Sequence, residues 1–331
     1  MAAILHSGRL SYGTHSQAFE KSLAKTIGSE NILAVSGFNS AVTIALLTLG
    51  IGEGDEIIAS PMSCLASTQP LLSTGAKVVW ADVDPSLGTL CPDSVKARIS
   101  PRTKLILQNH FCSIIGHADE ITAIGRTKGI PVAEDVLEGF MGEYNGRPVG
   151  SLCDLSIISF SYVRLPQALE AAALYFADNA LLEKARMHRD LGINREAFRL
   201  PDGEINPICD ISINGLNAAI NEIQGYIGCQ SMADITKLTA KQRSNAAAWD
   251  VGTRLKPITN SKANFCYWVY PVLAEDKKAA MDYFKKQGYQ ASGVHISNHR
   301  YTVFGKQGEP QGALEFESKF FALPCGWWED I

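Results

Sequence analysis

The sequence lacks several features that would each define a class of protein. It has no uninterrupted apolar run of about 18 residues, so no transmembrane helix is predicted. Its eight cysteines include no CxxC pair and its seven histidines no HxH pair, so no metal site is expected. There is no excess of basic residues, because the sequence has 30 Lys and Arg residues and 34 Asp and Glu residues. A net charge of -4 gives no support to nucleic-acid or anionic-membrane binding.

Targeting features are also missing. The segment Met1–Gly8 has neither the basic start nor the long apolar stretch of a signal peptide. Single, scattered cysteines in a chain of 331 residues favour reduced thiols over a disulfide framework. These features predict a cytoplasmic protein.

What the sequence does contain is a regular alternation of short apolar runs and helical patterns over its first 180 residues. The runs are 32–35, 56–59, 77–80, 104–107, 130–133 and 155–158. Helical patterns lie between several of them, at Ser40–Leu49 and Ala118–Arg126 for example. The runs are mostly apolar and do not alternate with polar residues, as expected for strands covered by helices on both faces. The sequence therefore predicts an α/β fold with a mostly parallel sheet flanked by helices.

The pattern weakens around residues 185–215, where a charged stretch leads into the turn-rich segment 200–207. A loop this long inside a compact protein is usually functional or interfacial. A helical stretch follows, from about Leu216 to Asp250, and then strand and helix signals alternate to the end, with Tyr267–Leu273 as a strand and Lys277–Gln287 as a helix. We expect a large α/β domain over 1–215, and a helix plus a smaller C-terminal α+β domain over 216–331.

Four polar features stand at the carboxyl ends of predicted strands, where ligands of open α/β sheets bind. Asn39 and Ser40 lie in a small-residue turn that opens a helix, which suits a phosphate or is a simple helix cap. Asp135 ends a strand and could pair with a protonated ring nitrogen of a ligand, or be a solvated carboxylate. Ser159 could donate to a phosphate or be structural. His110 could serve the site or be a satisfied, half-buried histidine.

Taken together, these features resemble the DegT/DnrJ/EryC1/StrS family of sugar aminotransferases, which depend on pyridoxal phosphate (PLP) and have fold type I. The resemblance covers nearly the whole chain. The matching stretches are 35–41, 49–57, 74–85, 99–104, the pair 133–135 and 146–151, and 215–224. The second of these, Leu-Gly-Ile-Gly-Glu-Gly-Asp-Glu-Ile, is close to a family motif, and the third is nearly identical to one.

The resemblance implies a role for each matching residue. Asn39 and Ser40 would hold the cofactor phosphate, and Ser159 would also reach it. Asp135 would bind the pyridine nitrogen. Asn217 would reach the phosphate of another subunit, which implies a homodimer with shared sites. The segment 294–301 could line the sugar site. The implied substrates are nucleotide-linked keto sugars in surface-polysaccharide or secondary-metabolite pathways.

The sequence also departs from the family at the positions that carry its chemistry. The lysine that forms the imine with PLP is replaced by Arg164, and the closest downstream lysine is Lys184. A guanidinium is always charged and cannot attack an aldehyde. The aromatic residue that stacks on the cofactor ring is replaced by Cys64, and the side chain beneath the ring is Glu138.

Three interpretations remain open. The protein could bind pyridoxamine phosphate (PMP) or PLP without a covalent bond and act as a lysine-independent, dehydratase-like enzyme, with His110 or Glu138 as base. It could be a nucleotide-sugar enzyme that uses no PLP, with Arg164 gripping a sugar phosphate or a carboxylate. It could instead be a non-catalytic subunit that pairs with a lysine-bearing paralogue.

Overall fold

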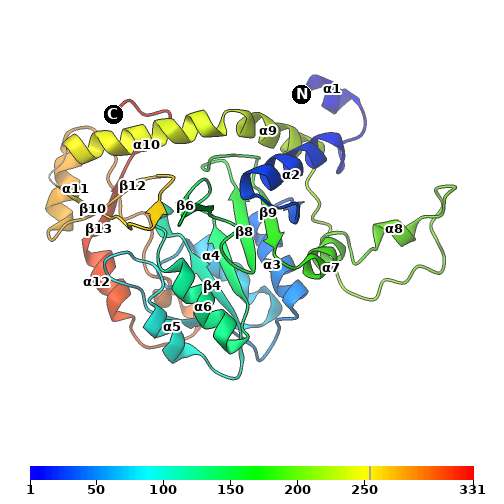
Figure 1. The fold of residues 1–331 in the computed structure, drawn as a ribbon, viewed down its shortest axis with the longest axis horizontal. Helices are drawn as coiled ribbons and strands as arrows, with labels where there is room; N and C mark the ends of the chain where they lie inside the picture. The colour runs from blue at the N-terminus through cyan, green and yellow to red at the C-terminus, as the bar shows by residue number, and fades with distance from the viewer. Residues whose placement is uncertain (253–254) are drawn as a thin grey trace.

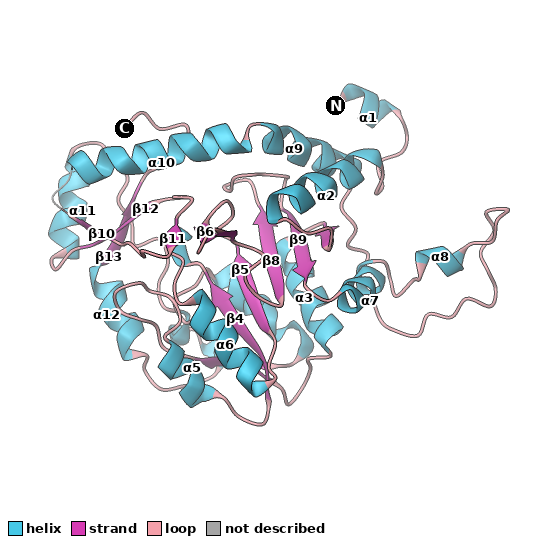
Figure 2. Cartoon of the chain, in the orientation of Figure 1, coloured by secondary structure: helices cyan, strands magenta, loops and turns pink. Residues whose placement is uncertain are grey.

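The computed structural model describes residues 1–252 and 255–331, and its centre is a seven-stranded sheet (Figures 1 and 2). The order across the sheet is β1-β9-β8-β5-β4-β2-β3. The strands are β1 Ile32–Val35, β2 Glu56–Ala59, β3 Lys77–Trp80, β4 Thr103–Asn109, β5 Val132–Val136, β8 Leu155–Phe160 and β9 Ala171–Phe176. Each of the six predicted strands is present, with shifts of up to three residues at its ends.

One strand of this sheet, β9, runs against the others. It pairs antiparallel with both β1 and β8, whereas the remaining neighbours pair parallel. The predicted mostly parallel sheet is therefore confirmed. Strand β9 was not among the predicted strands, because its opening run of three alanines, Ala171–Ala173, has weak strand propensity. The segment forms a strand because it is buried between its two neighbours, β1 and β8.

Helices cover both faces of the sheet, and the alternation of side chains along each strand divides the core in two. On β1, Ala34 packs into one core with Phe19, whereas Leu33 and Val35 pack into the other with Ala41. Helices α2 Thr14–Ile27, α5 Pro92–Arg98 and α6 Ala118–Lys128 line the first core, and α3 Phe38–Leu49 and α7 Asn179–Arg189 line the second.

Two helices, α9 Glu222–Ala233 and α10 Ile235–Gly252, follow one another along one side of the molecule (Figure 1). The sequence predicted a single helical stretch from about Leu216, and this start is wrong. Asn221 caps α9 by accepting from the Gln224 backbone N–H at 2.9 Å, and the Gln224 side chain accepts from the Asn221 N–H. This capping box stops the helix from beginning earlier.

The C-terminal part is a small mixed unit around the sheet β10-β12-β13. Strand β12 begins three residues later than predicted, at Tyr270. The elements here are β10 Lys256–Pro257, β12 Tyr270–Leu273, β13 Phe320–Leu323, α11 Lys277–Lys286 and α12 Gln311–Lys319. A second small sheet contains β6 Glu143–Tyr144, β7 Arg147–Pro148 and β11 Ala263–Asn264. The domain boundary at residue 216 stays a prediction.

Short helices complete the described parts of the chain. They are α1 Ala2–His6, α4 Leu65–Thr68 and α8 Arg195–Phe198, with 3-10 turns η1 Gln69–Thr74, η2 Phe111–Ser113, η3 Asn298–Arg300 and η4 Thr302–Phe304. None of the helices in 1–252 and 255–331 combines the length and the apolar character that crossing a membrane requires.

Residues 191–215, with α8 among them, project from the molecule as an arm (Figure 1). Five of its large apolar side chains are exposed, and Ile208 has the largest exposed fraction, 88%. The others are Leu191, Leu200, Ile205 and Ile211. Exposed apolar groups gathered on a projecting segment indicate an interaction surface.

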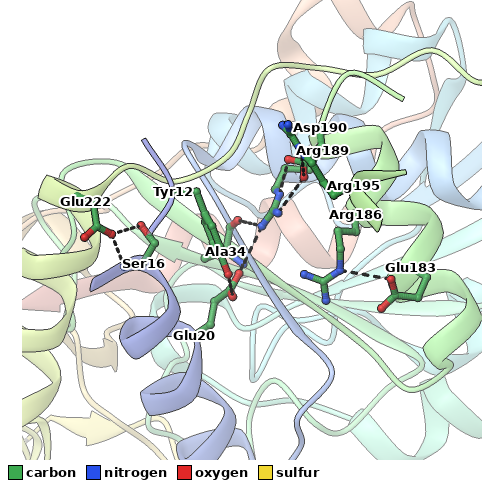
Figure 3. A network of polar contacts seen from close by, with 10 residues as sticks. All are labelled: Tyr12, Ser16, Glu20, Ala34, Glu183, Arg186, Arg189, Asp190, Arg195 and Glu222. Atoms are coloured by element: carbon green, nitrogen blue, oxygen red, sulfur yellow. Dashed lines mark hydrogen bonds and ion pairs between the residues drawn. The ribbon is translucent and has the colours of Figure 1, made fainter. Parts of the chain in front are cut away.

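A buried network of polar contacts anchors the base of this arm (Figure 3). Arg189 donates to Asp190 at 2.9 Å and to the backbone oxygen of Ala34 at 3.3 Å. Glu20 of α2 accepts from the Ala34 backbone N–H at 2.8 Å. Because the network links α2, β1 and α7, it holds the base of the arm in place against the main sheet.

Candidate active site

The predicted site residues, apart from Asn217, lie at one edge of the sheet. The carboxyl ends of β1, β2, β4, β5 and β8 meet there, since these strands all run in one direction. Ser159 is on β8, Asp135 is on β5, and His110 follows β4 directly. Cys64 lies beyond β2.

A pocket of about 480 Å³ opens at this edge, and Asn39, Ser40, Cys64, Ser159 and Arg164 all line it. Helix α3 begins at the pocket, and its cap residue makes no side-chain hydrogen bond. The first N–H groups of a helix have no partner within the helix, and the helix dipole is positive there. This part of the pocket therefore suits a phosphate, as predicted.

Arg164 is buried beside the pocket, with 7% of its surface exposed. Its Nη2 donates to Oε1 of Glu138 at 3.2 Å, and its guanidinium carbon lies 3.7 Å from the ring centroid of Trp268. Within the described parts of the chain, Nε and Nη1 of Arg164 have no hydrogen-bond partner. The side chain is thus held on one edge, and two of its nitrogen atoms are buried without a partner.

Glu138 is the residue on which this part of the site converges. Its carboxylate accepts from Arg164, lies 3.0 Å from Nε2 of His295, and accepts from the Cys112 backbone N–H at 2.6 Å. Burial alone raises the pKa of Glu138, but the His295 hydrogen bond and the Arg164 charge outweigh it and leave the pKa below its usual value. A carboxylate held in this way is a weak proton acceptor.

Asp135 lies in a separate, much smaller cavity of about 10 Å³. Its Oδ1 accepts from the Leu137 backbone N–H at 3.0 Å, and burial raises its pKa to about 6. The side chains of Cys64 and Leu137 line this cavity as well as the large pocket. The two spaces are therefore adjacent, and Asp135 lines the small one and not the large pocket.

His110 is fully buried, with its Nε2 3.0 Å from Oε1 of Glu134. It lines the small cavity and not the large pocket. Asn217 is exposed and forms a β-bridge with Asp190 at the base of the arm, outside the pocket of its own chain. The roles predicted for His110 and Asn217 stay predictions.

Sequence reasoning missed Leu137, which lines the pocket, Trp268, which packs on the Arg164 guanidinium, and the link between Glu138 and His295. Segment 294–301, which contains His295, was expected at the sugar site for other reasons. Unusual backbone conformations mark these contacts: φ is positive at Cys112, Tyr267 and Val294. Strain of this kind in residues other than glycine gathers at functional sites. The residue types at these positions give no indication of a positive φ.

No group of three or more His, Cys, Asp or Glu side chains within 1–252 and 255–331 is placed to hold a metal ion. The eight cysteines are free thiols. The site is therefore built from backbone N–H groups, hydroxyls, carboxylates and one guanidinium.

Fold and pocket together define an α/β protein of the fold-type-I aminotransferase class. The sequence profile of the DegT/DnrJ/EryC1/StrS aminotransferase family matches residues 1–326, and the chain belongs to this family.

Known relatives agree with this assignment. The chain is 24% identical over 337 residues to the spore coat polysaccharide biosynthesis protein SpsC of Bacillus subtilis, covering 97% of this chain and 87% of SpsC. The crystal structure of the sugar aminotransferase CalS13 from Micromonospora echinospora superposes with a TM-score of 0.91 at 24% identity, over 99% of this chain and 91% of CalS13. The PMP form of the sugar aminotransferase homologue Spr1654 from Streptococcus pneumoniae superposes with a TM-score of 0.89 at 18% sequence identity. The superposition covers 99% of this chain and 91% of Spr1654.

The family is PLP-dependent, so the fit of that cofactor can be tested on this chain. The start of α3 and Ser159 fit its phosphate. The rest of the site does not fit its covalently attached form, because the Arg164 guanidinium has no free amine and Asp135 lines a separate, smaller cavity. The pocket at the start of α3 suits an anion, and Arg164 would not form a covalent bond with PLP.

Proposed function

We propose that this protein acts on a nucleotide-linked keto sugar in surface-polysaccharide or secondary-metabolite biosynthesis, without forming a Schiff base. Membership of the sugar aminotransferase family supports the substrate class. The observation that supports the rest is that Arg164, which the sequence resemblance aligns with the family's lysine, is buried and paired with Glu138 at 3.2 Å.

The chemical reason is the difference between an amine and a guanidinium. A transaminase needs its lysine as the nucleophile that holds the cofactor and as the base that moves a proton. Arg164 stays protonated and does neither. The chain's own residues can still bind an anion at α3, orient the ligand with Ser159, and limit the width of the pocket with Leu137.

The exposed arm supports a homodimer, because Ile208 and its apolar neighbours lack cover in a single chain. Asn217, at the base of the arm, would then contribute to the partner's pocket. A heterodimer with a lysine-bearing paralogue is the alternative, in which this chain completes the other subunit's site without reacting itself.

The test is a set of absorbance and binding measurements on the purified chain. PLP and PMP are added separately, spectra are recorded, and the PLP sample is reduced with borohydride and weighed by mass spectrometry. Binding of nucleotides and nucleotide sugars is followed by calorimetry. Arg164→Lys, alone and with Glu138→Gln, is the matched control that can regain an imine.

We expect no imine band and no reduced adduct in the unsubstituted chain, together with saturable binding of a nucleotide sugar. Saturable PMP binding would add a lysine-independent cofactor reaction to this function, whereas no binding of PLP or PMP would favour chemistry without either. A site-specific PLP adduct in the unsubstituted chain would contradict the proposal. Nucleotide-sugar binding only in the presence of a paralogue would replace it with the partner role.

A further inference from the structure

His295 is the accessible member of the buried polar cluster around Glu138. Its Nε2 lies 3.0 Å from Oε1 of Glu138, and 20% of its side chain is exposed. The other ring nitrogen, Nδ1, makes no hydrogen bond to a residue in 1–252 or 255–331, and it is not buried. Nδ1 is therefore open to an incoming ligand. The preceding residue, Val294, has a positive φ of 59°, which a β-branched residue rarely adopts and which is typical of functional sites.

Glu138 determines which nitrogen of the His295 ring carries the proton. The pKa of Glu138 lies below its usual value, so the group is a carboxylate that accepts from Nε2–H, and the lone pair of the neutral ring is on Nδ1. The carboxylate is itself held by Arg164 and by the Cys112 backbone N–H. A buried carboxylate bonded to one histidine nitrogen orients the ring and stabilises the imidazolium that forms when the other nitrogen takes a proton.

The segment that follows His295 fixes it beside the two spaces of the site. Asn298 donates to the backbone oxygen of Ser63 at 3.2 Å. Ser63 lines the small cavity together with Glu138, and the next residue, Cys64, lines both that cavity and the large pocket. The imidazole ring is thus held against the wall of the site from two directions, through Glu138 and through the loop after β2.

The other titratable groups of the site are less suited to move a proton. His110 is fully buried, and Asp135 lines the small cavity alone. Glu138 is surrounded by donors, and Arg164 stays protonated. Histidine is the side chain whose ordinary pKa lies closest to neutral pH, so it both takes up and returns a proton under physiological conditions.

We propose that His295 is the proton-transfer residue of this protein and that Glu138 is its positioning residue. Nδ1 of His295 removes a proton from the carbon next to the keto group of a nucleotide-linked keto sugar. The electron pair of that C–H bond forms a C=C bond, the carbonyl π pair moves to the oxygen, and the imidazolium then returns the proton to carbon. This enolisation requires no amine nucleophile. The substrate class rests on the proposed function above.

Hydrogen exchange in heavy water tests this step on the full chain without added PLP or PMP. The probes are dTDP-linked and UDP-linked 4-keto-6-deoxyglucose, and NMR follows the loss of the proton signals next to the keto group. A sample without protein gives the spontaneous rate, and calorimetry measures binding of the same two sugars.

The decisive variant is His295→Gln, which removes the proton acceptor and keeps an N–H donor for Glu138. His117→Gln is the matched control. Nε2 of His117 lies 3.0 Å from the Asp84 carboxylate, as in the His295 pair, but His117 lines neither the large pocket nor the small cavity.

We expect the unsubstituted chain to exchange these protons faster than the sample without protein. His295→Gln should lower the exchange rate at saturating sugar by at least about a hundred-fold and leave the affinity unchanged. His117→Gln should exchange at the unsubstituted rate. In His295→Ala, added imidazole should restore part of the rate, because a free base then enters the space of the missing ring.

The positioning role of Glu138 is measured by the same two quantities. Glu138→Gln should lower the exchange rate at saturating sugar and leave the affinity unchanged, because the neutral amide no longer stabilises the imidazolium. Lost affinity with an unchanged rate at saturation would instead give Glu138 a purely structural role. Since this substitution leaves Arg164 without its partner, the measurement is repeated in a chain that also carries Arg164→Met.

Two results would overturn the assignment of His295. One is an equal exchange rate in His295→Gln and the unsubstituted chain. The other is the absence of exchange in an unsubstituted chain that binds either keto sugar. Failure of the proposed function is a separate result, since it shows as a PLP adduct or as no binding of either sugar, and no binding would also remove the substrate of the proton transfer.

Discussion

At the scale of single residues, the site depends on which carboxylates are paired. Glu138 is ionised and surrounded by donors, whereas Asp135 is buried with one backbone N–H as its hydrogen-bond donor. Glu138 therefore holds Arg164 and His295 in place. The Asp135 carboxyl can take up a proton or pair with a cation. The two carboxylates, only three positions apart, have opposite pKa displacements.

The raised pKa of Asp135 predicts a pH-dependent loss of stability. Burial raises this pKa to about 6, whereas an unfolded aspartate has a pKa of about 4. Between these values the folded state binds more protons than the unfolded state, so stability falls as the pH rises. Asp135→Asn removes this loss. Relative to the unsubstituted chain, the variant should gain about 2 kcal/mol between about pH 4.5 and about pH 8.

Urea unfolding of both proteins at the two pH values measures this difference. Asp93→Asn, at an exposed aspartate of α5, is the control and should show no comparable change. A stability difference for Asp135→Asn that is the same at both pH values would disprove the predicted titration.

Much of the site could be predicted from residue types at strand ends. Asn39, Ser40, Cys64, Ser159 and Arg164 do meet in one pocket, because parallel strands bring their carboxyl ends to one edge. Leu137 and Trp268 could not be predicted in this way. The positions of these two side chains depend on the conformation of the neighbouring backbone. The positive φ at Tyr267, beside Trp268, cannot be recognised from the sequence.

At the scale of elements, apolar runs and helical periodicity were enough to predict six strands of the main sheet and two of the helices between them, α3 and α6. The exceptions had local causes. Strand β9 opens with small residues that favour no strand by themselves, and the α9 capping box, at Asn221 and Gln224, overrides a helical pattern that extends further upstream.

The contact between α2 and α9 gives a prediction for these elements. Gly225 of α9 packs against the α2 backbone so closely that an added Cβ would lie 2.5 Å from the Ser16 nitrogen. Alanine normally stabilises a helix by up to about 1 kcal/mol relative to glycine. Here the clash with backbone should dominate, and Gly225→Ala should destabilise the protein by about 1–3 kcal/mol.

Chemical denaturation is the measurement. Ser244→Ala, at an exposed position of the neighbouring helix α10, is the control and should change stability by only a few tenths of a kcal/mol at about the level of helix propensity. An increase in the unfolding midpoint of Gly225→Ala would show that α9 can shift and that the contact is not tight.

At the scale of the whole molecule, the arm at 191–215 predicts self-association. A charge at Ile208, which is 88% exposed, should disfavour an interface that buries this side chain. We expect the unsubstituted chain to be a dimer and Ile208→Asp to shift it towards monomer, at least ten-fold in dissociation constant. Light scattering after size-exclusion chromatography, over a range of protein concentrations, measures the shift.

Val251→Asp is the matched control, because Val251 is 90% exposed and lies on α10, away from the arm in sequence. It should leave the dimer intact. A monomeric unsubstituted chain at micromolar concentration would contradict the homodimer and leave the paralogous partner as the subunit to seek.

Under the proposed function, the pairing of Arg164 with Glu138 also bears on how a lysine could be restored at position 164. Lysine at this position alone would lie near the Glu138 carboxylate, which favours the protonated and unreactive form of the amine. Changing Glu138 first would leave the buried guanidinium without its partner. Each single substitution towards a Schiff-base lysine is therefore unfavourable, so the ion pair would oppose imine chemistry at this position.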